Sequence, residues 1–216
     1  MIDKNECKNW WNEKAKDNPL YWIISNDNSK SESKFFATGI DSYNLITKDI
    51  KVTPEMDVLE IGCGVGRITF QFAKYCSSVN GIDICSEYIK LANEYKHRFK
   101  ISNIFFYEND GESFGIYKDN QFDLIYSFIV FQHIPYEQTL INNIKNAYRI
   151  LKPNGIFKFH HNRLSQQSEG DIGFGCSLSK ESVNDILKVG YELVNTYPDE
   201  SYKQYGRGWW TILKKI

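Results

Sequence analysis

The sequence lacks the features that mark several large classes of protein. It has no apolar run approaching the ~20 residues that a membrane-spanning helix needs, so no membrane span is predicted. Its N-terminal stretch, MIDKNECKNWWNEK, is charged and contains no apolar segment of the kind found in secretion signals. The net charge is −1, and neither end carries a long block of one sign. This balance argues against a protein that binds nucleic acid through bulk charge.

Cysteine is also sparse, and its pattern excludes two kinds of site. The five cysteines are odd in number and scattered, with no CxxC pair, so neither a disulfide framework nor a zinc site is predicted. We expect reduced thiols and a cytoplasmic protein without a metal. These cysteines are Cys7, Cys63, Cys76, Cys85 and Cys176.

Short apolar runs alternate with amphipathic segments of helical length, which favours an α/β fold with a largely parallel sheet. Seven strands are predicted, of which the last two form an antiparallel pair at one edge of the sheet. They lie at 57–61, 78–84, 104–108, 122–128 and 156–160, then within YELVNTYPD and RGWWTILKKI. Flanking helices are predicted near 67–75, 87–99, 136–151 and 180–189, the last with Ser179 as its N-cap. The turn Lys152-Pro153-Asn154-Gly155 is expected to separate the third of these helices from the fifth strand.

About fifty residues precede the first strand. They contain helical patterns near 4–16 and 35–47, joined by the polar stretch SNDNSKSESK. We therefore expect an N-terminal helical cover or lid over residues 1–50 and one α/β domain over 51–216.

Three glycines follow the first strand, in VLEIGCGVGRIT. A strand that ends in glycines and leads into a helix brings backbone N–H groups close to a ligand. The dinucleotide fingerprint G-x-G-x-x-G/A needs a small third residue, and that position is Arg67 or Thr69 here, depending on which glycine starts the count. This mismatch argues against a nicotinamide cofactor.

LEIGCGVGR resembles the E-x-G-x-G-x-G motif of class I S-adenosylmethionine-dependent methyltransferases, a Rossmann-like family. VNGIDI, ENDG, FDLIYSFIVFQHIP and RILKPNGIF resemble further motifs of that family in the same order, so the resemblance runs from about Met56 to Phe159. It implies that Asp83, seventeen residues after Gly66, binds the ribose and that Asp110 contacts the adenine. The cofactor it implies is S-adenosyl-L-methionine, with S-adenosyl-L-homocysteine as product. The full set of expected cofactor-binding residues is Tyr21, Glu60, Gly62, Cys63, Gly64, Gly66, Arg67, Asp83, Ile84, Asp110, Gly111, Phe128 and His133.

Within that set, several residues keep a second interpretation. Glu60 braces the glycine loop or contacts the cofactor, and Arg67 neutralises the cofactor carboxylate or forms a surface pair. Cys63 is interpreted as a small filler, and His133 as a packing residue at least as readily as a catalytic one. Tyr21 and Trp22 resemble the lid of small-molecule methyltransferases.

Methylation of an oxygen needs a general base, for which histidine is the usual choice. FKFHHNR places His160 and His161 at the end of the fifth strand, so one of them is predicted as base or substrate anchor, since alternation sends them to opposite faces. Arg163, Tyr205 and Arg207 are predicted to line the acceptor site.

DLIYSF differs from the N/D-P-P-Y/F motif of enzymes that methylate amino groups of nucleic acids, and the carboxylate cluster of catechol-type metal sites is missing. The expected activity is therefore O-methylation of a small polar acceptor, such as a sugar, a glycan precursor or a related metabolite. An amine or RNA acceptor, and a cofactor-binding protein without catalysis, stay open as alternatives. The oligomeric state stays open as well.

Overall fold

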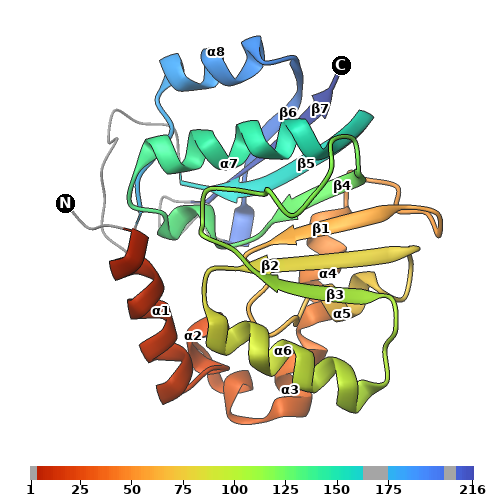
Figure 1. Cartoon of the computed structure of the whole chain (residues 1–216), viewed down its shortest axis with the longest axis vertical. Helices are drawn as coiled ribbons and strands as arrows, with labels where there is room; N and C mark the ends of the chain where they lie inside the picture. Colours follow the sequence, from red (N-terminus) through yellow and green to blue (C-terminus); the bar gives the residue numbers. More distant parts are fainter. Residues whose placement is uncertain (1–3, 163–174, 202–207) are drawn as a thin grey trace. The chain divides into compact units, whose positions relative to one another are not determined.

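The computed structural model describes residues 4–162, 175–201 and 208–216 (Figure 1). The chain divides into two compact units, one ending at Asp110 and one beginning at Gly111. The seven strands found in the described residues belong to one sheet, in the order β3-β2-β1-β4-β5-β7-β6. This mostly parallel sheet, with the last strands antiparallel and helices on its faces, confirms the predicted Rossmann-like α/β fold.

The first unit carries a parallel three-stranded part of the sheet. β1 pairs with β2 and β2 with β3, each in parallel. Figure 1 shows α6 running alongside β2 and β3, and α1 lying against α6. The elements of this unit are α1 (Lys4–Asp17), α2 (Tyr21–Ile24), η1 (Asp27–Lys30), α3 (Glu32–Ala37), α4 (Gly39–Thr47), β1 (Asp57–Ile61), α5 (Thr69–Phe72), β2 (Ser78–Asp83), α6 (Ser86–Phe99) and β3 (Ile104–Glu108).

The second unit carries both parallel and antiparallel pairs. β4 pairs with β5 in parallel, whereas β7 pairs antiparallel with both β5 and β6. This arrangement confirms the predicted antiparallel pair, with β6 last in the strand order. Its elements are β4 (Phe122–Ser127), η2 (Phe131–His133), α7 (Glu137–Ile150), β5 (Leu151–His161), α8 (Lys180–Lys188), β6 (Tyr191–Pro198) and β7 (Trp209–Lys215).

An apolar core in the first unit ties the N-terminal helices to the α/β elements. Phe35 of α3 is buried with Val65 of the glycine loop and Tyr88 of α6. Side chains from α1 and α2, including Trp11 and Ile23, pack against this core. The helices of residues 4–47 are therefore packed on the α/β elements of the same unit.

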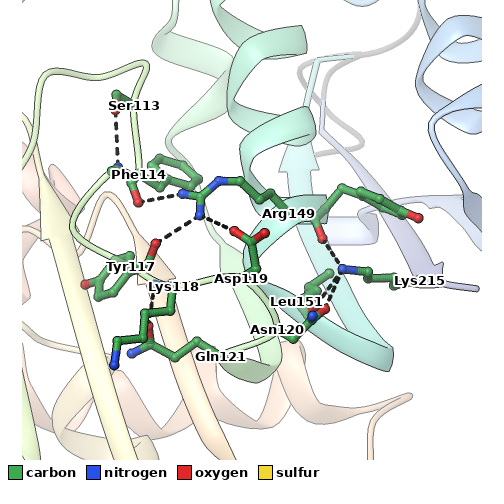
Figure 2. A network of polar contacts seen from close by, with 12 residues as sticks. Ser113, Phe114, Tyr117, Lys118, Asp119, Asn120, Gln121, Arg149, Leu151 and Lys215 are labelled. Carbon is green, nitrogen blue, oxygen red and sulfur yellow. Dashed lines mark hydrogen bonds and ion pairs between the residues drawn. The ribbon is translucent and has the colours of Figure 1, made fainter.

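A polar network fixes the loop before β4 in the second unit (Figure 2). Arg149, in the last turn of α7, donates to the carbonyls of Phe114 and Tyr117 and pairs with Asp119. Lys215 at the end of β7 donates to the Asn120 side chain and to two backbone carbonyls. Because these bonds lie at the start of β4, they brace the end of the strand opposite to Phe128.

Most predicted elements occur within a residue or two of their expected bounds, and three differ. The helix predicted over 35–47 is split at Thr38, and beside the break Gly39 lies so close to the carbonyl oxygen of Arg67 that a Cβ there would be 2.4 Å from it. The helix predicted over 67–75 is reduced to Thr69–Phe72, flanked by turns. β5 begins at Leu151 rather than 156, so the expected turn is an irregularity inside the strand, with Asn154 at φ 65°.

None of the helices in the described part of the chain is long and apolar enough to cross a membrane.

Candidate functional site

The three glycines after β1 all adopt backbone conformations that side chains disfavour. Gly62, Gly64 and Gly66 have φ of 74°, 51° and 86°. A Cβ on Gly66 would lie 2.6 Å from the ring of Phe106, and one on Gly64 would lie 3.0 Å from Ile23. The turn therefore needs glycine for both its φ values and its space.

Asp83, the last residue of β2, is bound to this turn. Its Oδ2 accepts a hydrogen bond from the backbone N–H of Gly64 at 2.8 Å, and its Oδ1 accepts from the N–H of Cys85 at 2.9 Å. Burial raises the pKa of this carboxyl to about 6, and the N–H groups of Cys85, Gly64 and Ile84 oppose that shift. The side chain is nevertheless partly exposed, as is Ile84 beside it. A carboxylate held this way presents further lone pairs to a ligand hydroxyl.

Glu60 and Arg67 are both buried and both bonded within the first unit. Glu60 accepts a hydrogen bond from the hydroxyl of Thr69, which braces the turn from beneath. The guanidinium of Arg67 donates to the hydroxyls of Thr38 and Ser42, at 3.1 and 2.9 Å. Arg67 thus joins the glycine loop to the N-terminal helices and lies away from the surface.

Cys63 fills space beneath the turn. A Cβ on Gly81 would lie 2.9 Å from the Cys63 side chain, so the two residues are in close contact across β1 and β2. Burial and the nearby carboxylates of Asp83 and Glu60 raise the pKa of the Cys63 thiol well above its usual range. A thiol that resists ionisation is a poor nucleophile, which agrees with the interpretation of Cys63 as a filler.

The remaining predicted cofactor residues lie on three other segments. Asp110 is exposed just after β3, and Gly111, with φ 80°, accepts a hydrogen bond from Asn143 through its carbonyl. Phe128 and His133, both partly exposed, follow the carboxyl end of β4. Tyr21, in α2, is 41% exposed.

Two contacts of the N-terminal layer had no signal in the sequence. Ile23 packs over Gly64, which places α2 against the glycine turn. The side-chain oxygen of Asn12 in α1 accepts from the Cys85 thiol, the Ser86 hydroxyl and the Glu87 N–H at 3.1–3.3 Å. α1 thereby caps α6, directly after Asp83. An asparagine in an amphipathic helix gives no hint of such a remote partner.

The two adjacent histidines of β5 are both buried, with exposures of 0% and 2%. His161 is held by the protein at both ring nitrogens, through Asn162 O at 2.6 Å and Thr211 Oγ1 at 2.8 Å. His160 points to the opposite face, as alternation predicted, with Nε2 3.5 Å from Oδ2 of Asp199. Burial lowers the pKa of each imidazole to about 4, which Asp199 opposes at His160.

Asp199 is a residue that the sequence did not single out. It is 3% exposed, directly follows β6, and comes close to His160 because β7 lies between β6 and β5. Arg163, Tyr205 and Arg207 lie outside the described residues. Among the residues that the structure does describe, no group of three His, Cys, Asp or Glu side chains could hold a metal ion.

Residues 59–159 match a family model described as a methyltransferase domain. A phosphoethanolamine N-methyltransferase from Plasmodium falciparum is 32% identical over 126 residues, which span 57% of this chain and 46% of that protein. A ubiquinone biosynthesis O-methyltransferase from Coxiella burnetii is 28% identical over 162 residues, 71% of this chain and 60% of that protein. The chain thus spans about half the length of these relatives.

The fold is shared with the N-methyltransferase NodS from Bradyrhizobium japonicum, solved in complex with S-adenosyl-L-homocysteine. The TM-score is 0.67 at 18% identity, covering 97% of this chain and 98% of that one. The residues that match the family model contain the end of β1, the glycine turn, Asp83 and most of β5. The comparisons therefore confirm, over residues 59–159, the similarity to class I S-adenosylmethionine-dependent methyltransferases that the sequence motifs predicted.

Proposed function

We propose that this protein binds S-adenosyl-L-methionine and transfers its methyl group to an oxygen of a small polar acceptor, such as a sugar or related metabolite. Most residues proposed for the cofactor belong to the first unit, whereas Gly111, Phe128 and His133 belong to the second. The second unit also contains the candidate base.

The glycine turn and Asp83 fit the cofactor in two respects. Gly62, the partly exposed glycine of the turn, has a φ of 74° and no side chain, which suits close approach of an amino-acid moiety. The Asp83 carboxylate, fixed by Gly64 and Cys85, is partly exposed at the carboxyl end of β2 and suits the two hydroxyls of a ribose. Charge-assisted bonds of that kind are about twice as strong as neutral ones.

When bound, the cofactor supplies an electrophilic methyl group on a sulfonium. The protein then has to orient the acceptor and remove a proton from it. We propose that His160 accepts that proton, because the Asp199 carboxylate lies 3.5 Å from its Nε2 and favours the imidazolium against the burial that disfavours it. His161 is assigned a structural role, since its two nitrogens are bonded to Asn162 and Thr211.

The observation that carries the choice of oxygen is the proximity of His160 and Asp199. A hydroxyl loses its proton at neutral pH far less readily than a protonated amine does, so O-methylation gains more from a base. The relatives include an N-methyltransferase and an O-methyltransferase, so their names alone do not decide between the two.

The proposal is tested by incubating the protein with S-adenosylmethionine carrying a carbon-13 methyl group and a metabolite extract. The shift of the transferred carbon separates a methoxy product from an N-methyl product. We expect a methoxy product in the small-molecule fraction. The product should be absent with Asp83→Ala and retained with the matched variant Asp57→Ala, which lies at the start of β1, at the end of that strand away from the glycine turn. An N-methyl product, or label in RNA, would replace the proposed acceptor class. An unlabelled extract, despite measured cofactor binding, would favour a protein without catalysis.

A further inference from the structure

The surroundings of Asp199 show that its carboxylate is fixed in one orientation. Oδ1 accepts hydrogen bonds from the backbone N–H of Ser201 at 2.9 Å and from the Ser201 hydroxyl at 2.6 Å. Oδ2 accepts from the indole N–H of Trp210 at 3.0 Å. The backbone N–H of Asp199 is bonded to the carbonyl of Gly208 at 2.9 Å. A buried carboxylate with this many donors cannot rotate without losing several bonds.

Trp210 is equally restrained. It lies on β7, where it pairs with His160 of β5 on one side and with Tyr197 of β6 on the other. Its ring stacks on that of Phe128, with centroids 5.2 Å apart and an interplanar angle of 12°. Phe128 directly follows β4, and His160 is the next-to-last residue of β5. Because these two strands are parallel neighbours, the group lies at the carboxyl ends of both strands.

His160 is held between these partners. Its ring makes edge contacts with Phe128 and Trp210, at centroid separations of 5.6 and 5.1 Å, and its side chain is fully buried. Nε2 lies 3.5 Å from Oδ2 of Asp199. A neutral imidazole carries its proton on only one nitrogen, and a carboxylate beside Nε2 favours the tautomer with the proton there.

We propose that Asp199 is a positioning residue that keeps the proton of neutral His160 on Nε2, so that the lone pair at Nδ1 is the one that receives the acceptor's proton. This inference rests on the proposed function, in which His160 is the base. The proton removed from the acceptor hydroxyl would then reside on Nδ1, and Asp199 would stabilise the resulting imidazolium.

The neighbouring histidine provides an internal contrast. Nδ1 of His161 faces the carbonyl oxygen of Asn162, which only accepts, so His161 must carry its proton on Nδ1. The hydroxyl of Thr211 can then donate to Nε2. Two adjacent histidines of one strand are thus expected to hold opposite tautomers.

Other titratable groups near His160 affect the charge on its imidazole. Lys158, two residues earlier on the same face of β5, is fully buried over the ring of Trp210. His161 and His133 both disfavour a positive charge on His160. Replacing Asp199 therefore removes a negative charge from a group that also contains a buried cation, so the matched control must carry the same charge change.

The test uses the whole protein with nitrogen-15 histidine and two-bond nitrogen–proton spectra, which report the tautomer of each of the four histidines. No acceptor is needed. We expect His160 with its proton on Nε2 and His161 with its proton on Nδ1, assigned with His160→Gln. In Asp199→Asn, His160 is expected to become a mixture of tautomers. Asp123→Asn on β4 removes a different carboxylate, the one paired with Lys152 of β5, and is expected to leave the His160 tautomer unchanged.

A second readout separates positioning from structural support. In Asp199→Asn, the initial rate of labelled methyl transfer should fall by about 10-fold or more. The affinity for S-adenosylhomocysteine, measured by calorimetry, should stay within about twofold of wild type. Should Asp199→Asn fail to fold, Ser201→Ala removes one donor to Oδ1 and is expected to shift the tautomer in the same direction.

Wild-type His160 with its proton on Nδ1, or an unchanged tautomer in a folded Asp199→Asn, would overturn the inference. Failure of the wild-type protein to bind S-adenosylhomocysteine would instead overturn the proposed function. The spectra would still show whether Asp199 sets the tautomer of His160, since they need no cofactor.

Discussion

Burial of Asp83, the residue proposed to bind the ribose of the cofactor, is predicted to cost the unliganded protein stability at neutral pH. Its pKa of about 6, against an ordinary 3.8, means that folding disfavours the charged carboxylate. One pKa unit corresponds to about 1.4 kcal/mol, so the full penalty is about 3 kcal/mol, and partial exposure reduces it to about 1–2 kcal/mol. Because the folded-state pKa is the higher one, the protonated carboxyl stabilises the folded protein relative to the charged carboxylate. This contribution to the free energy of unfolding is fully present below pH 3.8 and is lost as the pH rises through 6.

Asp83→Asn removes the titration and keeps a carbonyl oxygen for one of the two backbone N–H groups. The losses from the second N–H are the same at every pH. The free energy of unfolding of the variant minus that of wild type should therefore be larger at pH 7.5 than at pH 4.5, by about 1–2 kcal/mol. Urea unfolding followed by circular dichroism at the two pH values measures this difference.

The same variant should bind S-adenosylhomocysteine about 10–100-fold more weakly, since a hydrogen bond to a charged group contributes about 1.5–3 kcal/mol. Asp41→Asn, on an exposed residue of α4, is the matched control. An Asp83→Asn protein whose stability difference is equal at both pH values, or reversed, would refute the reasoning about burial.

Three further variants probe the first unit. Gly66→Ala should destabilise the protein by about 2–4 kcal/mol, as its Cβ would clash with Phe106 at a positive φ, and thermal unfolding measures the loss. Asn12→Ala should raise hydrogen exchange in the first turn of α6 and in α1, with a stability loss of about 1–2 kcal/mol; unchanged exchange would contradict the capping role. Arg67→Met should cost about 1–3 kcal/mol through its lost bond to Thr38, and a preserved melting temperature would speak against that link.

Local pattern was sufficient for most of the architecture. The bounds of β1 and β3 agree with prediction because apolar runs and flanking turns define them without help from distant residues. The Ser179 N-cap is confirmed for the same reason: its side chain accepts from the N–H three residues later. Glycine spacing likewise identified the turn at Gly62–Gly66.

Tertiary contacts decided what the sequence could not show. Gly39 packs against a backbone oxygen 28 positions away, and the cap on α6 depends on Asn12. Asp199 approaches His160 only because β7 runs between their strands, and nothing in YPDES marks it. Periodicity and motif spacing report on neighbours in the chain, so partners of this kind stay invisible to them.

Binding of S-adenosylmethionine by the glycine turn and Asp83 is tested most directly by calorimetric titration with S-adenosylhomocysteine and with NADH. We predict one-to-one binding of S-adenosylhomocysteine, lost in Asp83→Ala, and no binding of NADH. Tight binding of NADH, or equal affinity of the wild-type and Asp83→Ala proteins for S-adenosylhomocysteine, would contradict the account.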